Sequence, residues 1–112
     1  MDGERIVVGW TTVETGEQAE NLAGNLIRER LAACVQIDAP IRSHYRWGGS
    51  ACADSEIRIW IKTTPEKVAG ICAFFEKSHP YDVPQWVWTS ASASASYAAW
   101  VDETTRTDGA GH

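Results

Sequence analysis

The sequence predicts a single α+β domain in the order β-α-β-β-α-β, followed by one further helix. Two observations support this prediction. Segments with apolar residues at helical spacing alternate with segments whose apolar residues recur at every second position, and a length of 112 residues supplies one hydrophobic core but not two. We therefore expect residues 1–112 to form one domain, with a core over about residues 6–103 and a flexible tail over residues 104–112.

The first half of the chain begins with a strand and a helix. Residues 6–12 form a short apolar run that is typical of a buried central strand. Thr15 stands three residues before Gln18, which is the spacing of a capping box at a helix start. The apolar residues that follow recur at helical spacing: Ala19, Leu22, Ala23, Leu26, Ile27 and Leu31.

From residue 35 the apolar period changes to two, which predicts a long hairpin. On the first strand, alternation places six residues on one face: Val35, Ile37, Ala39, Ile41, Tyr45 and Trp47. Pro40 cannot donate a ladder hydrogen bond, so we expect a bulge or an unpaired edge there. Residues 48–50 make a turn, and the return strand repeats the alternation at Ile57, Ile59, Ile61 and Thr63.

The second half reads as a helix, a strand and a terminal helix. Thr64 caps the helix and Pro65 occupies its first position, while Pro80 ends it. The expected buried stripe of this helix is Val68, Ile71, Cys72 and Phe75. A last strand is expected over about residues 83–89, followed by a helix that begins near Ser96 and carries Tyr97, Trp100 and Val101 on one side.

This order of elements is the split β-α-β arrangement of ferredoxin-like folds, in which both helices pack on one face of the sheet. If Ile59 and Ile61 meet the helices, Trp60 points to the other face. An uncovered sheet face with large aromatic side chains is typical of a contact surface, which predicts an obligate homo-oligomer. The alternative is that the terminal helix folds back over the tryptophans.

Bulk composition argues against several classes of function. Ten Lys and Arg against fifteen Asp and Glu give a net charge of -5, and nucleic-acid affinity depends on basic residues that neutralise phosphates, so we expect no nucleic-acid partner. The sequence has no apolar run long enough to span a bilayer, and its first residues do not read as a signal peptide. Three cysteines without CxxC spacing favour a reducing compartment. We therefore expect a cytoplasmic protein with no membrane partner.

The sequence contains none of the familiar catalytic motifs, such as GxGxxG, a Walker loop, a nucleophile elbow or HExxH, so we expect no enzymatic activity. The strongest candidate for a site is the segment His79-Pro80-Tyr81-Asp82-Val83-Pro84, because two prolines within it fix the backbone and hold polar groups in place. Two interpretations stay open. The segment is either a binding site or a structural corner in which His79 caps helix carbonyls and Tyr81 packs.

Four motifs in register resemble the CutA family of divalent-cation tolerance proteins. They are RERLAACV at residues 28–35, YRWGG at residues 45–49, Glu56 together with IKTT at residues 61–64, and HPYDVP at residues 79–84. The resemblance runs from about Ile6 to Val101. It implies a ferredoxin-like fold assembled as a tight homotrimer, similar in architecture to PII signalling proteins, and an association with tolerance to copper and other divalent ions without an established catalytic activity.

The resemblance also implies where a site lies. In trimers of this family the recurring polar residues gather in clefts between subunits, and by motif position these residues are Cys34, Trp47, Glu56, Lys62, His79 and Tyr81. His79 is the candidate metal ligand among them. The copper ligands proposed in the family include a cysteine in the first strand and paired histidines before the Pro-Tyr motif, and these positions hold Trp10 and Ser78 here.

We therefore expect a non-enzymatic homotrimer that serves divalent-ion tolerance, with copper or another divalent cation as the candidate ligand of a cleft between subunits. The alternative is a PII-like sensor in which Lys62, Arg46 and His79 bind a small acidic ligand. A hydrolase of the acylphosphatase type is disfavoured, because residues 11–14 do not supply the glycine-rich anion loop that such an enzyme needs.

Overall fold

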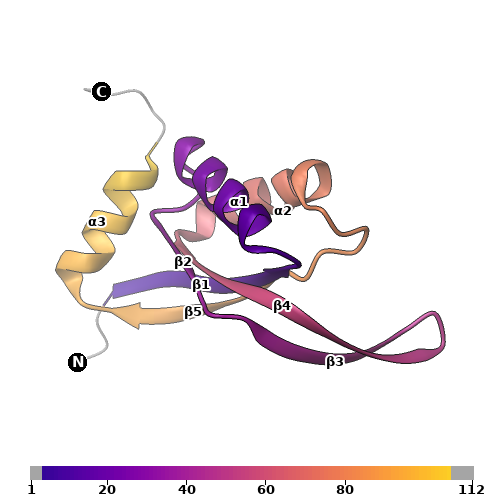
Figure 1. Cartoon of the computed structure of the whole chain (residues 1–112). Coiled ribbons are helices and arrows are strands. Elements are labelled where there is room, and N and C mark those ends of the chain that lie inside the picture. Colours follow the sequence, from indigo (N-terminus) through magenta and orange to yellow (C-terminus); the bar gives the residue numbers. More distant parts are fainter. Residues whose placement is uncertain (1–3, 107–112) are drawn as a thin grey trace.

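The computed structural model of the chain describes residues 4–106, which form an antiparallel sheet with three α-helices (Figure 1). The elements in order are β1 (Glu4–Val13), α1 (Gly16–Arg28), β2 (Cys34–Ile37), β3 (Ile41–Trp47), β4 (Ser50–Thr63), a 3-10 turn (Pro65–Lys67), α2 (Val68–Ser78), β5 (Val87–Ala93) and α3 (Ala95–Thr105). The predicted α+β class is confirmed, and the order of elements agrees except that the first strand of the predicted hairpin is divided into β2 and β3. Of the residues 104–112 expected to be a tail, Thr104 and Thr105 belong to α3, and residues 107–112 lie outside the described part of the chain.

The sheet has the strand order β2-β4-β1-β5, and β3 extends it by pairing with β4 alone. The neighbours β1 and β4, β1 and β5, β2 and β4, and β3 and β4 all run antiparallel. Helices α1 and α2 lie together on one face, as the split β-α-β arrangement requires, and the hairpin of β3 and β4 reaches out beyond the body of the sheet (Figure 1). Among the described residues, no helix is long and apolar enough to cross a membrane.

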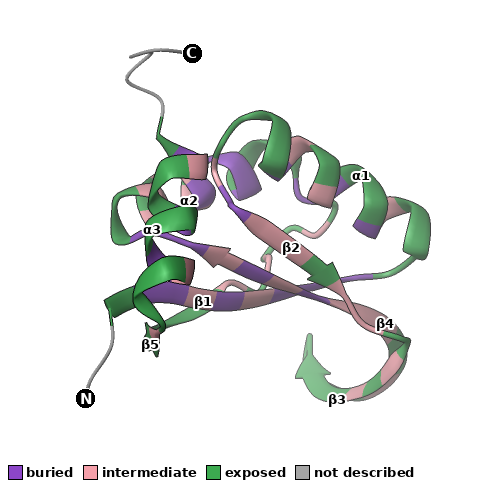
Figure 2. Cartoon of the chain, turned by 90° about the vertical axis from the view of Figure 1, so that its left-hand side faces the viewer, coloured by how far each residue is buried: buried purple, intermediate pink, exposed green. Residues whose placement is uncertain are grey.

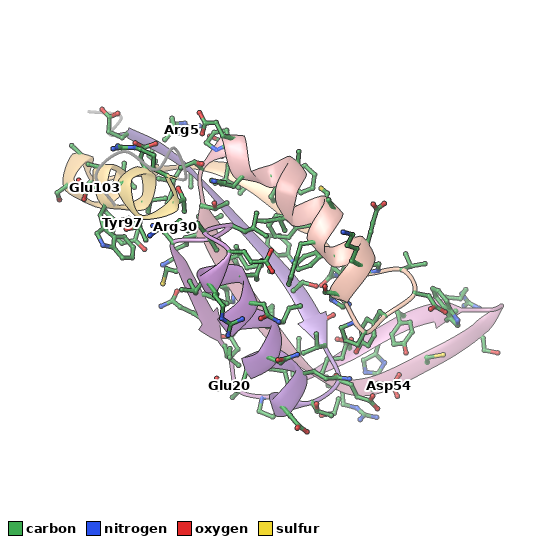
Figure 3. The ribbon with its side chains drawn as sticks, turned by 90° about the horizontal axis from the view of Figure 1, so that it is seen from above. Arg5, Glu20, Arg30, Asp54, Tyr97 and Glu103 are labelled. Atoms are coloured by element: carbon green, nitrogen blue, oxygen red, sulfur yellow. The ribbon has the colours of Figure 1, made fainter. Side chains whose placement is uncertain are left out.

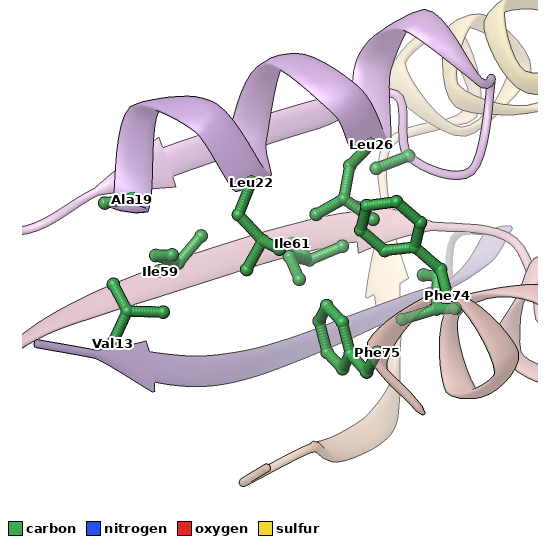
Figure 4. Close-up of a cluster of buried hydrophobic side chains, with 10 residues drawn as sticks. Val13, Ala19, Leu22, Leu26, Ile59, Ile61, Phe74 and Phe75 are labelled. Atoms are coloured by element: carbon green, nitrogen blue, oxygen red, sulfur yellow. The ribbon is translucent and has the colours of Figure 1, made fainter. Parts of the chain in front are cut away.

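The main core lies between this pair of helices and the sheet (Figure 4). Ile59 and Ile61 of β4 are fully buried there, as the alternation predicts, against Leu22 and Leu26 of α1 and Phe75 of α2. Of the predicted stripe of α2, Ile71 and Phe75 are buried, together with Phe74, whereas Val68 and Cys72 are only half-buried. The three described cysteines are all free thiols.

Local chemistry explains where α1 begins. The Thr15 hydroxyl accepts a hydrogen bond from the Gln18 N–H at 3.1 Å, and the Gln18 side chain accepts from the Thr15 N–H at 3.1 Å. This reciprocal pair is the capping box that the sequence predicts. The backbone after α1 turns sharply through Arg30, which has a positive φ of 58°.

The hairpin is confirmed, but one predicted face of its first strand is wrong. Val35 and Ile37 pair with Ile61 and Ile59, whereas Ile41 pairs with Glu56 and every later partner follows that register. The pairing therefore slips by one residue across residues 38–40, where Pro40 interrupts the ladder. Because side chains alternate along β4, this slip moves Tyr45 and Trp47 to the face opposite Val35 and Ile37.

The turn of the hairpin follows its glycines. Gly48 and Gly49 have φ values of 58° and 82°, which is the geometry of a two-residue hairpin turn that favours glycine. Beyond the sheet body the hairpin is mostly exposed (Figure 2), and Trp47 keeps 58% of its surface accessible.

The last strand begins later than predicted. It covers Val87–Ala93 rather than residues 83–89, so the serine and alanine run is the strand itself and not its end. Trp86 precedes the strand, and its ring packs edge-on against Phe75, with 5.5 Å between centroids. Ser94 caps α3 by accepting from the Tyr97 N–H, two residues before the expected Ser96.

The second face of the sheet is only partly covered. Helix α3 packs on Ile6 and Val8 at one end, together with Ala91 and Ala93 of β5. The rings of Trp10 and Trp60 lie further along this face with their centroids 5.3 Å apart, outside the cluster that α3 covers. Trp60 therefore points away from α1 and α2, as predicted, and α3 does not fold over this tryptophan pair.

Candidate functional site

His79 is held firmly by its neighbours at the end of α2. The residue is 9% exposed, and its ring and that of Phe75 meet in a T-shaped arrangement with 5.2 Å between centroids. The Tyr81 N–H donates a hydrogen bond to Nδ1 at 3.1 Å, and Nε2 lies 2.9 Å from Oγ1 of Thr11. Because Nδ1 accepts, the neutral ring carries its proton on Nε2 and donates it to the buried Thr11.

Burial lowers the pKa of His79, and a hydrogen bond with the backbone of Thr12 and the charge of Glu56 act in the opposite direction. The ring is therefore held in its neutral form beside the C-terminal end of β1. The His79 side chain does not cap helix carbonyls, as the structural interpretation expected, because its two nitrogens bond Thr11 and the Tyr81 N–H instead. It holds the backbone from which Tyr81 extends.

Tyr81 connects this corner to the hairpin. Its hydroxyl donates a hydrogen bond to Glu56 of β4 at 2.8 Å. Burial raises the pKa of Tyr81, and the hydrogen bond to Glu56 raises it further. On the hairpin itself, the Tyr45 hydroxyl donates to the Asp54 carboxylate, which raises the pKa of Tyr45 to about 12. Both phenols remain protonated donors at neutral pH.

These residues surround an open pocket of about 1120 Å³. One wall is formed by the hairpin, with Tyr45, Trp47 and Glu56, and the other by the segment after α2. Thr12 and residues of the turn after β1 line the base. The proline-braced segment and the far end of the hairpin are therefore brought together by the fold.

Cys34 and Lys62 form a separate group. They pair across β2 and β4, and the Lys62 ammonium lies 5.7 Å from the centre of the Tyr97 ring of α3. Burial raises the pKa of Tyr97, and the neighbouring Cys34 thiol adds to this shift. The group lies on the face of the sheet to which α3 contributes.

The six residues expected to share one cleft therefore divide into two sets within a single chain. Trp47, Glu56 and Tyr81 line the pocket, with His79 directly behind them. Lys62 lies six residues from Glu56 along β4, which corresponds to about 20 Å of extended strand. Tyr97, which contacts Lys62, and Asp54, which lines the pocket, lie at opposite ends of the molecule (Figure 3).

The donors do not fit a metal ion within one chain. In residues 4–106, no group of three or more His, Cys, Asp or Glu side chains is placed to hold an ion together. Both ring nitrogens of His79 already have hydrogen-bond partners. A divalent ion requires several ligands that converge on it, so a metal centre cannot be assembled from the described residues of a single copy without rearrangement.

The structure adds residues that sequence reasoning missed. Tyr45 and Asp54 line the pocket as a hydrogen-bonded pair, and Thr11 fixes the ring of His79. Their signal in the sequence is weak, because each contact joins segments whose proximity depends on the register of the sheet. The positions of Tyr45 and Asp54 on one hairpin are the one clue, since the two-residue turn at Gly48 and Gly49 sets which residues face each other.

Comparison with known proteins identifies relatives across the whole domain. A family model described as CutA1 divalent ion tolerance protein matches residues 7–104. The chain is 37% identical over 95 residues to the divalent-cation tolerance protein CutA of Thermus thermophilus, which covers 84% of this chain and 92% of the relative. It is 34% identical over 101 residues to the chloroplastic protein CutA of Arabidopsis thaliana, covering 89% of this chain and 56% of the relative.

The chain therefore spans little more than half the length of the Arabidopsis relative, and nearly all of the Thermus one. Among solved structures, the crystal structure of CutA1 from Oryza sativa superposes with a TM-score of 0.87 at 31% identity, covering 96% of this chain and all of that one. Sequence and structure agree along the same region, so this chain belongs to the CutA1 divalent ion tolerance protein family.

Proposed function

We propose that the chain serves tolerance to divalent cations as a non-enzymatic homotrimer, with its functional cleft between subunits. The observation that carries the proposal is the family match over residues 7–104, together with relatives that are named as divalent-cation tolerance proteins.

Two features of the single chain support assembly. The pocket group around Glu56 and Tyr81 and the group of Cys34 and Lys62 lie about 20 Å apart along β4, so a shared cleft requires a second copy. The Trp10 and Trp60 rings form an aromatic surface on the face that α3 leaves open. Native mass spectrometry at several protein concentrations tests the trimer, and a protein that stays monomeric at micromolar concentration contradicts it.

Copper is the finer part of the proposal. An ion that binds His79 must displace Thr11 from Nε2 or the Tyr81 amide from Nδ1, and it needs further ligands from another copy because the described residues of one chain offer no group of three. Titration of the wild-type protein and the His79→Ala variant with Cu²⁺ is the direct test. Equal affinities would remove His79 from any metal role.

Tolerance itself is tested in cells. A strain that lacks its own protein of this family is complemented with this chain and challenged with graded concentrations of copper, cadmium and zinc. Growth restored by the wild-type chain supports the proposal, and growth that is indistinguishable from the empty vector for all three ions contradicts it. The cytoplasmic location that the sequence predicts is part of the proposal, and one relative is named as chloroplastic.

A PII-like sensor of small acidic ligands is less well supported. Lys62, Arg46 and His79, the residues expected to bind an anion, do not line the pocket. Lys62 lies against Tyr97 near the C-terminal end of β4. The side chain of His79 is buried and bonded to Thr11. The single chain therefore offers no place where these three groups meet an acidic ligand.

A further inference from the structure

We propose that Trp88, Trp86 and Tyr81 form a redox-active series of aromatic residues, which passes an oxidising equivalent from the edge of the sheet to the Tyr81 hydroxyl. The co-substrate is a one-electron oxidant, such as an oxidised metal complex or an oxygen-centred radical. This activity is separate from divalent-ion tolerance. It does not depend on assembly either, because every residue involved belongs to one chain and electrons tunnel between packed rings without solvent access.

The rings lie in one unbroken series of contacts. Trp88 and Trp86 have centroids 5.4 Å apart, with their planes inclined by 31°. Trp86 meets Phe75 at 5.5 Å. Phe75 in turn meets His79 at 5.2 Å, and His79 meets Tyr81 at 5.3 Å. Indole and phenol rings give up an electron far more readily than a phenyl or a neutral imidazole ring, so Phe75 and His79 are the packed medium through which the electron tunnels.

Trp88 is the outer end of the series. It belongs to β5, the last strand in the order β2-β4-β1-β5, and it is 45% exposed. A one-electron oxidant removes an electron from the Trp88 indole and is itself reduced. Trp88 then recovers an electron from Trp86, whose ring lies beside it, so the oxidising equivalent moves inward by one residue.

Trp86 lacks the proton acceptor that would trap the oxidising equivalent on it. Its Nε1 is buried and has no hydrogen-bond partner among the described residues, although a buried N–H normally has one. An indole radical cation becomes a weaker oxidant when it loses its N–H proton to a nearby base. Oxidised Trp86 has no such base, so it keeps its proton and remains able to take an electron from Tyr81.

Tyr81 has the proton acceptor that Trp86 lacks. Its hydroxyl donates a hydrogen bond to a Glu56 carboxylate oxygen at 2.8 Å. A phenol radical cation is a very strong acid, so a phenol is oxidised readily only when its proton leaves with the electron. The electron passes to Trp86, the phenol O–H bond breaks, and a new O–H bond forms on Glu56. The products are a neutral tyrosine radical, a reduced Trp86 and a protonated Glu56.

The other two tyrosines each have only one of these features. The Tyr45 hydroxyl also donates to a carboxylate, that of Asp54, but in residues 4–106 no ring contact joins Tyr45 to a tryptophan. The Tyr97 ring lies 5.6 Å from that of Trp100, but the side chain bonded to its hydroxyl is a thiol and not a carboxylate. Of the three described tyrosines, Tyr81 combines a series of rings with a proton acceptor.

The test is oxidation of the full chain by photogenerated ruthenium(III) tris-bipyridine, with the radicals followed by transient absorption. We expect the tryptophan radical to decay as a tyrosine radical appears, and this coupled phase should be slower in D₂O because a proton moves with the electron. Tyr81→Phe should lose the coupled phase and Tyr45→Phe should keep it. In Glu56→Gln the amide oxygen still accepts the hydrogen bond but is a poor base, so the coupled phase should be about a hundredfold slower.

Matched variants trace the route of the electron. Trp88 and Trp100 are 45% and 43% exposed, so Trp88→Phe and Trp100→Phe each remove a tryptophan of similar exposure. The yield of the coupled phase should fall in Trp88→Phe alone. Trp86→Phe keeps a ring against Phe75 but removes the oxidisable indole, and it should also lose the coupled phase. Circular dichroism and thermal unfolding establish that the compared variants are folded, and the comparison of D₂O with water uses the wild-type chain alone.

Three results would overturn the proposal. One is a coupled phase of the same rate and yield in the wild-type chain and in Tyr81→Phe. Another is an equal loss of yield in Trp88→Phe and Trp100→Phe, which would mean that exposure alone decides which tryptophan feeds the tyrosine. The third is a rate that changes neither in D₂O nor in Glu56→Gln. None of these results depends on whether the chain forms a trimer or confers copper tolerance.

Discussion

A single added methyl group at Gly9 tests the packing between β1 and the segment before β5. Gly9 lies on the face of β1 that meets α2, and a Cβ built there would approach two atoms of the Trp86 ring and the carbonyl oxygen of Val87, each at 2.6 Å. Side chains can rotate away from such a contact, but the Val87 carbonyl is part of the backbone. The Gly9→Ala variant therefore has to move β5 or accept the clash.

The magnitude follows from two opposing terms. Overpacking of a core costs about 1–3 kcal/mol, and replacing glycine in a strand returns about 0.5–1 kcal/mol of conformational entropy. We expect Gly9→Ala to lower the free energy of unfolding by about 1–2 kcal/mol. Gly24→Ala is the matched control, because Gly24 lies on the exposed side of α1 and its added Cβ meets nothing closer than the Arg28 guanidinium at 3.8 Å. That variant should gain about 0.5–1 kcal/mol.

The assay is urea unfolding followed by far-ultraviolet circular dichroism, at one fixed protein concentration because association couples stability to concentration. A third comparison separates the effect of the Trp86 ring from that of the Val87 carbonyl. In a Trp86→Leu background the ring contact is gone and the Val87 carbonyl remains, so Gly9→Ala should still destabilise the protein, but by less. Shifts of the same sign and size in Gly9→Ala and Gly24→Ala would refute the reasoning from close contacts.

Three further changes have defined outcomes. Thr15→Ala removes the acceptor for the Gln18 N–H and should lower the free energy of unfolding in urea by about 1 kcal/mol, whereas Thr15→Ser should stay within a few tenths. The lowered pKa of His79 means that the unfolded chain binds the proton more tightly than the folded one. The contribution of His79 to the free energy of unfolding is therefore present above pH 6.5 and is lost as the pH falls below it, with a limiting slope of about 1.4 kcal/mol per pH unit. His79→Gln should flatten this slope between pH 7.5 and 5.5, and an unchanged slope would assign it to other groups. The raised pKa of Tyr81 makes stability depend on pH in the opposite direction. The contribution of Tyr81 to the free energy of unfolding is present below pH 10 and is lost as the pH rises further. Tyr81→Phe should reduce that alkaline loss in pH-jump unfolding, and an identical profile would count against the bond to Glu56.

Elements with a local physical signal could be predicted from the sequence. The capping box of Thr15 and Gln18 sets the start of α1, and the glycines at 48 and 49 set the turn of the hairpin. The alternation of Ile59 and Ile61 identified the core face of β4. In each case the determining residues are neighbours along the chain, so no knowledge of distant partners was needed.

The position of β5 depended on tertiary contacts and was not predictable in this way. Trp86 and Val87 have a higher strand propensity than the serines and alanines that follow. The ladder with β1 nevertheless runs through the small residues, from Val87 opposite Trp10 to Ala93 opposite Glu4. Small side chains on this strand allow α3 to pack on Ala91 and Ala93, which is a requirement that local propensity does not express.

The candidate site was predicted in part. The segment around His79 and Tyr81 was recognised because its prolines and its motif are local. Its partners were not, because Thr11 is 68 residues from His79 and Glu56 is 25 residues from Tyr81. Glu56 was selected by resemblance alone, and the phenol-supported carboxylate at Asp54 was overlooked. The sequence also could not show that Cys34 and Lys62 lie far from the pocket within one chain.

The register slip at residues 38–40 makes the length of this connection as important as its composition. Val35 and Ile41 are six residues apart, whereas their partners Ile61 and Glu56 are five apart, so this stretch holds one residue more than a regular ladder needs. Loss of that one residue leaves the pairing of β2 and of β3 with β4 in place, so Val35 and Ile37 keep the core face and Tyr45 and Trp47 keep the opposite one. Deletion of a single residue between β2 and β3 should therefore be tolerated by the sheet, an expectation that aligned sequences can test without any further structure.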